Sequence, residues 1–117
     1  MQGSEKEFEE LLELCKRLNL PTRLLNFRTI LKNIDFVKKL LNLGDKILKH
    51  EITYFYISRD FRCIKLTSYQ VANVLKVRSI KKVGIYLPLL IAYLYKHGFT
   101  RISLMRDKRR ITYRLCK

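Results

Sequence analysis

The sequence has little of what enzymes and cofactor-binding proteins commonly need. Its 117 residues include no tryptophan, four glycines, two prolines and two histidines. The glycines are scattered, so no glycine-rich phosphate-binding loop is present. His50 and His97 fall in separate predicted elements, and the acidic residues cluster only near the N-terminus. No spacing suggests a Ser/His/Asp arrangement. We therefore expect a protein without enzymatic activity and without a cofactor.

A long hydrophobic run is also missing. The longest, residues 83–95, is thirteen residues long and contains Gly84 and Pro88, whereas a membrane span needs about 20 residues. We interpret this run as a buried helix and expect no membrane association. No segment joins a basic start to an apolar stretch and a small-residue cleavage site. These absences favour an intracellular protein.

Cysteine is sparse and its spacing is uninformative. The three cysteines, Cys15, Cys63 and Cys116, lie far apart, form no Cys-x-x-Cys pair and have no histidine close by. We expect three reduced thiols in the core or on the surface, and no metal site.

Acidic residues are few, and their distribution is uneven. The chain has 25 lysines and arginines against 10 aspartates and glutamates, a net charge of +15. Residues 1–14 hold five glutamates and one lysine, so subtracting their net −4 leaves +19 for the rest of the chain. Such a concentration of positive charge on a small surface indicates an anionic partner, and nucleic acid is the usual one.

The N-terminal half is predicted to be helical. Ser4 and Glu7 have the spacing of a capping box, which predicts a helix over residues 5–19 that ends before Pro21. A second helix is predicted from a narrow apolar seam at alternating spacings of four and three residues. That seam consists of Leu20, Leu24, Phe27, Leu31 and Ile34.

Residues 35–58 allow two interpretations. The favoured one is a helix that starts at Asp35, weakens at Gly44 and continues through Phe55. In the alternative, the β-branched and aromatic residues 52–57 form a strand paired with residues 62–66.

The C-terminal half has clearer signals. Thr67 and Gln70 form a second capping box, which starts a short helix. A turn at residues 77–79 leads to a further helix that Ser79 caps and that stops at Gly98. Pro88 should kink or break that helix.

A hairpin is predicted after Gly98. Ile102 and Leu104 alternate with polar residues, and residues 110–115 alternate in the same way. The two strands would be joined through a cationic tip at residues 106–109.

This order of elements resembles the winged helix-turn-helix family over about residues 62–117. The resemblance is carried by LTSYQVANVLKVRSIKKVGIYL (66–87), KHGF (96–99) and RRITYRL (109–115). It implies a mainly α fold with a small antiparallel β-hairpin, the wing, and extra N-terminal helices. Residues 59–117 would form the DNA-binding domain, and residues 1–58 a helical region for packing or dimerisation.

The resemblance also implies which residues contact double-stranded DNA. The second helix of the motif enters the major groove with its first residues, the first helix crosses the backbone, and the wing contacts phosphates or an adjacent minor groove. Matched onto this sequence, the contacting residues are Thr67, Ser68, Tyr69, Gln70, Arg78, Ser79, Lys81, Lys82, Tyr86, Arg106, Lys108, Arg109 and Arg110.

One departure from the family pattern concerns the second helix of the motif, which is apolar on nearly all sides from Val83 onward. Such a helix has to be covered on all sides. One side belongs to the motif's own core. The other would be covered by the N-terminal helices or by a second subunit, which would give a homodimer.

We expect a DNA-binding transcription regulator, cytoplasmic and associated with the nucleoid. Two alternatives remain open: a DNA-binding accessory subunit of a replication or recombination complex, and an RNA-binding or ribosome-associated basic protein. Frequent Ile, Leu, Lys, Arg and Tyr with only two glutamines are typical of a thermophilic source.

Overall fold

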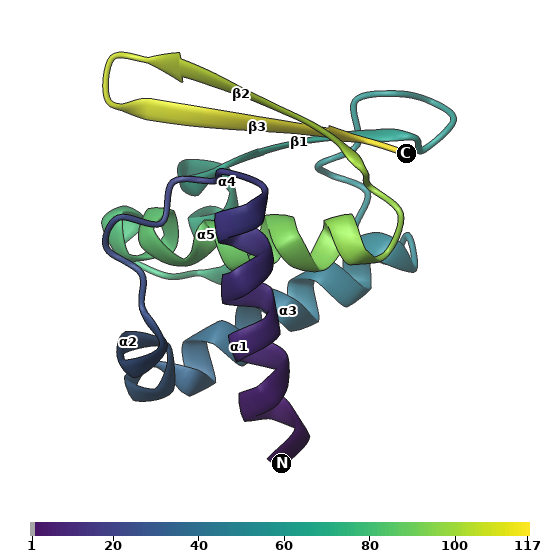
Figure 1. Ribbon diagram of the computed structural model, residues 1–117. Coiled ribbons are helices and arrows are strands. Elements are labelled where there is room, and N and C mark those ends of the chain that lie inside the picture. The colour runs from purple at the N-terminus through teal and green to yellow at the C-terminus, as the bar shows by residue number, and fades with distance from the viewer. Residues whose placement is uncertain (1) are drawn as a thin grey trace.

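The fold combines helices with one small antiparallel sheet (Figure 1). The computed structural model describes residues 2–117, with side chains from Glu5 onward. Within this range the elements are α1 (Gln2–Arg17), α2 (Phe27–Lys32), α3 (Ile34–Leu48), β1 (Cys63–Thr67), α4 (Ser68–Leu75), α5 (Ile80–Lys96), β2 (Arg101–Asp107) and β3 (Arg110–Cys116).

The sheet has the order β1-β3-β2, and both pairs are antiparallel. The predicted hairpin is confirmed as β2 and β3, with Asp107 opposite Arg110. Its turn is tighter than predicted and consists of Lys108 and Arg109, because Arg106 already pairs with Ile111 inside the ladder. β1 pairs with β3 only as far as Thr112. The end of the hairpin therefore extends beyond β1.

The favoured helix over residues 35–58 is correct only in its first part. α3 ends at Leu48, and the chain then turns through His50 at a φ of 60°. The following segment lies along the outer edge of β1, where Ile57 N donates to Cys63 O at 3.0 Å and Lys65 N donates to Phe55 O at 3.0 Å. A continued helix through Phe55 is thus wrong. The alternative, a strand over residues 52–57 that pairs with residues 62–66, is closer to the structure, although the pairing is limited to an isolated bridge between Tyr56 and Ile64.

Two predictions near the N-terminus are also wrong. α1 begins at Gln2, so Ser4 lies inside the helix and is not its cap. The apolar seam does not form one helix, because α2 starts only at Phe27, where the Asn26 side chain caps it. Leu24 precedes that helix and is 59% exposed.

The caps in the C-terminal half are confirmed. The Thr67 hydroxyl accepts from Gln70 N at 3.2 Å, and the Ser79 hydroxyl accepts from Lys82 N at 3.1 Å. Gly98 follows α5 at a φ of +116°, a conformation that favours glycine. α5 is assigned as one helix across Pro88, so a break at this position is excluded.

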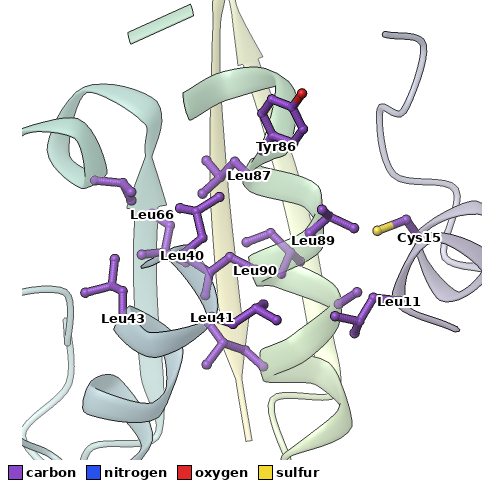
Figure 2. Close-up of a cluster of buried hydrophobic side chains, with 14 of the residues drawn as sticks. Leu11, Cys15, Leu40, Leu41, Leu43, Leu66, Tyr86, Leu87, Leu89 and Leu90 are labelled. Carbon is purple, nitrogen blue, oxygen red and sulfur yellow. The ribbon is translucent and has the colours of Figure 1, made fainter. Parts of the chain in front are cut away.

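α5 lies at the centre of one hydrophobic core. Figure 2 shows its Leu87, Leu89 and Leu90 between side chains of α1 on one side and of α3 on the other. Of the two alternatives for the second side of α5, the structure shows coverage by the N-terminal helices. A second subunit is therefore not needed for this purpose.

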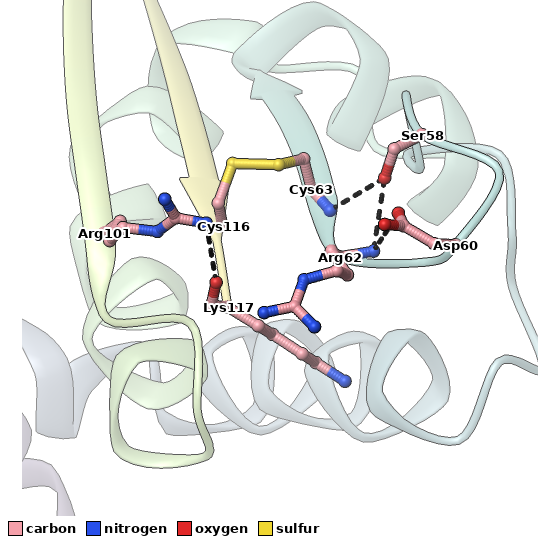
Figure 3. The surroundings of a disulfide bond; sticks show 7 residues. All are labelled: Ser58, Asp60, Arg62, Cys63, Arg101, Cys116 and Lys117. Atoms are coloured by element: carbon pink, nitrogen blue, oxygen red, sulfur yellow. Dashed lines mark hydrogen bonds between the residues drawn. A yellow bond between two sulfur atoms is a disulfide. The ribbon is translucent and has the colours of Figure 1, made fainter.

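The expectation of three reduced thiols is wrong for two of them. Cys63 and Cys116 are opposite each other on β1 and β3, with their Cα atoms 4.1 Å apart, and form a disulfide (Figure 3). They are 53 residues apart in sequence, so only the strand register brings them together. Cys15 is a free thiol and is fully buried.

Two structural features are absent from the described residues. None of the helices is both long and apolar enough to cross a membrane. Residues 2–117 also contain no group of three or more histidine, cysteine, aspartate or glutamate side chains placed to hold a metal ion.

Candidate nucleic-acid interface

A groove of about 970 Å³ lies between the start of α4, the start of α5 and the hairpin of β2 and β3. The loop after α1 contributes to it as well. The lining residues are Pro21, Arg23, Leu24, Lys65, Thr67, Ser68, Tyr69, Gln70, Ile80, Lys81, Gly84, Ile85, Asp107, Arg109, Arg110, Ile111, Thr112 and Tyr113. Seven of the thirteen predicted contact residues are among them, from three separate parts of the sequence.

The start of α4 supplies four of these seven residues, Thr67, Ser68, Tyr69 and Gln70. Thr67 is fixed as the helix cap, and its hydroxyl also donates to Gln70 Oε1 at 3.2 Å. Tyr69 is 56% exposed, so its ring is available to a ligand. An exposed tyrosine beside free helix-terminal amides suits contact with a phosphate backbone.

Close packing of α4 on α5 brings this helix end to the groove. A Cβ atom added at Gly84 would lie 3.1 Å from the Ser68 hydroxyl oxygen. The absence of a side chain at Gly84 therefore lets the first turn of α4 approach α5. Glycine at this position therefore has a local structural reason.

The start of α5 contributes less than predicted. Lys81 lines the groove and is exposed. Lys82 does not line it, because its ammonium lies over the ring of Phe36, 4.9 Å from the centroid. Arg78 and Ser79 are exposed but also lie outside the lining.

The prediction that Tyr86 contacts DNA is wrong. Its side chain is only 5% exposed. The hydroxyl donates to Thr29 O at 3.2 Å and accepts from Asn33 Nδ2 at 2.8 Å, and the ring packs edge-on against Phe36. Tyr86 therefore fastens α5 to α2 and to the start of α3, a role that only the tertiary arrangement of these helices defines.

The hairpin divides its four predicted cations into two pairs. Arg109 and Arg110 line the groove. Arg106 and Lys108 are exposed but are not part of the lining. Strand alternation alone does not account for this division, because the consecutive residues Arg110, Ile111, Thr112 and Tyr113 all line the groove.

Two cations of the groove were not predicted, namely Arg23 from the loop after α1 and Lys65 from β1. Among the described residues, the lining holds five lysines and arginines, Arg23, Lys65, Lys81, Arg109 and Arg110, and one acid, Asp107. A cleft lined by one sign of charge concentrates ligands of the opposite sign. Neither Arg23 nor Lys65 belongs to a local sequence motif, so the only sequence signal for them was the general excess of positive charge.

One titratable group of the groove, the phenol of Tyr113, is held in its neutral form. Burial of this residue raises the pKa of the phenol to about 12. Like an ordinary tyrosine it is protonated at neutral pH, and the raised pKa keeps it neutral at more alkaline pH as well.

The described chain is a mixed α/β protein whose helices and three-stranded antiparallel sheet surround one core. Its cationic groove includes all three parts of the sequence for which contacts with nucleic acid were predicted. Comparison with protein-family models, with curated proteins and with solved structures finds no match for this chain.

Proposed function

We propose that this protein is a non-enzymatic double-stranded DNA-binding protein of the winged helix-turn-helix type. The observation that carries the proposal is the cationic groove. It joins the start of α4, the start of α5 and the hairpin tip, which are the three parts that the resemblance assigns to DNA contact. The arrangement of α4, α5, β2 and β3, with β1 completing the sheet, supports the same proposal.

In this proposal the first turn of α5 approaches the major groove, which is about 12 Å wide and admits a helix. Arg109 and Arg110 of the hairpin contact phosphates or the adjacent minor groove. Thr67, Ser68 and Tyr69 contact the backbone on the other flank of α5. These contacts are charge-assisted or come from free amides, as is typical of phosphate recognition.

The distribution of acidic residues supports this orientation. Glu9, Glu10 and Glu13 are exposed on α1 and line a second hollow together with Arg17 and Lys96. The N-terminal end of α1 points away from the hairpin (Figure 1). A polyanion is therefore repelled from α1 and attracted to the groove.

The experiment is a salt titration of binding to a 20-base-pair duplex, followed by fluorescence anisotropy. The double variant Arg109→Ala/Arg110→Ala should weaken binding and reduce the slope of log K against log salt by about two, since each lost phosphate contact removes about 0.9. A matched control is Lys39→Ala/Lys46→Ala, which removes two exposed cations of α3 that do not line the groove. If both double variants lose affinity equally, the groove is not the binding site.

Two further arms separate the remaining alternatives. A-form grooves admit a helix poorly, so the proposed mode of binding predicts weaker affinity for an RNA hairpin than for duplex DNA. Tighter binding to the RNA hairpin would favour the RNA-binding alternative. Sizing of the protein in the absence of DNA tests the predicted homodimer through the N-terminal helices. A dimer would support the prediction, and a monomer at the concentrations used for binding would contradict it.

A further inference from the structure

The groove offers a duplex many charges but few groups that distinguish base pairs. α5 contributes Ile80, Lys81, Gly84 and Ile85 to the lining. Of these four described residues, only Lys81 has a polar side chain. From Tyr86 to Ala92 the helix is buried in the core. Within the groove, the first turn of α5 therefore presents a single polar side chain.

Of the other polar groups near the start of α5, Arg78 is exposed outside the lining, and two are engaged within the fold. Lys82 lies over Phe36, and the Ser79 hydroxyl accepts from Lys82 N. Gln70 is the one side-chain amide of the lining, and its carbonyl oxygen accepts from the Thr67 hydroxyl. An amide side chain suits bidentate contact with adenine, but the oxygen of the Gln70 amide is already engaged by Thr67 at the start of α4.

The apolar part of the lining adds little to the recognition of base edges. Leu24, Tyr69 and Ile80 are exposed large hydrophobic residues that border the groove. Apart from the Tyr69 hydroxyl, they carry no hydrogen-bond donor or acceptor for a base pair, and their contacts are limited to sugars and the thymine methyl group. Arg109 and Arg110 lie at the hairpin tip, where contacts follow phosphates and minor-groove width.

We propose that the groove binds duplex DNA of any sequence, through phosphate charge and groove shape. This inference rests on the proposed function and names the substrate class of the same site. A good bidentate side-chain contact distinguishes base pairs by roughly 5-fold to more than 100-fold. A lone lysine acts as a flexible point charge and lacks that geometry. The inference therefore favours an accessory or DNA-covering role over a regulator that reads one discrete site.

The test is selection from a pool of 20-base-pair duplexes with randomised centres, at moderate salt, followed by sequencing of the bound fraction. We expect no discrete motif, and affinities for unrelated duplexes of equal GC content that agree within about threefold, well below the specificity of sequence-reading proteins. A motif preferred by more than about 100-fold over scrambled sequence would overturn the inference.

Lys81→Ala provides a second readout. Loss of the Lys81 ammonium in this variant should weaken binding to every duplex by the same factor, roughly two- to fivefold, as expected for one phosphate contact. Lys39→Ala is the matched control, because Lys39 is exposed and outside the groove. A loss confined to one sequence would show that Lys81 reads bases, and would contradict the inference.

The outcomes separate this inference from the proposed function. If the protein binds duplex DNA strongly and the bound fraction shows a discrete sequence motif, the inference of sequence-tolerant binding is overturned and the proposed function stands. Failure to bind any duplex at low salt overturns the proposed function and the inference with it.

Discussion

The thiol of Cys15 donates a hydrogen bond to the carbonyl oxygen of Pro88, at 3.2 Å between sulfur and oxygen. Cys15 is on α1 and Pro88 is in the middle of α5, 73 residues later. The contact docks the acidic N-terminal helix on the helix whose first turn lines the groove. Both residues are buried, so the sulfur also fills space in the core.

Stability at alkaline pH should depend on Cys15. Burial raises the pKa of its thiol from 9.0 to about 12. Because the pKa is higher in the folded than in the unfolded chain, the associated stabilisation is complete below pH 9 and is lost as the pH rises towards 12. Cys15→Ala should cost about 1–2 kcal/mol at pH 7 through the lost packing, and its free energy of unfolding should fall less steeply above pH 9.

Urea unfolding at several pH values checks this prediction. In Cys15→Ala the remaining alkaline decline should begin about one pH unit later, because burial raises the pKa of Tyr113 from 10.0 to about 12. Parallel curves for the variant and the wild type between pH 9 and pH 10 would contradict a role for the thiol.

Gly44→Ala should destabilise the packing of α3 on α5. An added Cβ would lie 2.9 Å from Cδ2 of Tyr93 and 3.0 Å from Cδ1 of Leu90. The Tyr93 ring has limited freedom to move, because its hydroxyl donates to Asp45. Overpacking costs about 1–3 kcal/mol and better helix propensity offsets about 1 kcal/mol, so we expect a net loss of up to about 2 kcal/mol.

Thermal or denaturant unfolding measures this change. Asn42→Ala is the control, because Asn42 is exposed on the same helix and its replacement by alanine adds propensity without a clash. A Gly44→Ala protein as stable as the Asn42→Ala protein would show that α3 and α5 can move apart at little cost in free energy.

The disulfide should stabilise the fold without being needed for binding. It closes a loop between residues 53 apart, so its loss in Cys63→Ala/Cys116→Ala should lower the free energy of unfolding by about 4 kcal/mol in the chain-entropy description. Cys116 ends β3, whereas the groove-lining Arg110 begins it at the hairpin turn. We therefore expect DNA affinity to be retained under conditions in which the variant is folded.

Alkylation of the unfolded protein checks the bond itself. Without a reductant, one cysteine should be labelled, and with a reductant three should be. Cys15→Ala serves as the control and should give no label without a reductant. Three labels without a reductant would mean that Cys63 and Cys116 are not bonded.

Much of the C-terminal half could be predicted because its signals are local. The caps at Thr67 and Ser79 act on amides three residues later, and the alternation in β2 and β3 pairs neighbours across a two-residue turn. The N-terminal half was less predictable. An apolar seam at helical spacing between residues 20 and 34 is interrupted by Pro21 and by the Asn26 cap, and these short-range signals prevailed over periodicity.

The sequence by itself determined the helix caps, the hairpin and the positive charge available to an anionic partner, since these follow from neighbouring residues or from composition. Only the tertiary structure decided that Tyr86 is buried, that Lys82 folds over Phe36, that Cys63 bonds Cys116, and that Arg23 and Lys65 join the groove. Each of these outcomes brings together segments that are distant along the chain, and their meeting depends on how α5 and the sheet pack, which no local pattern encodes.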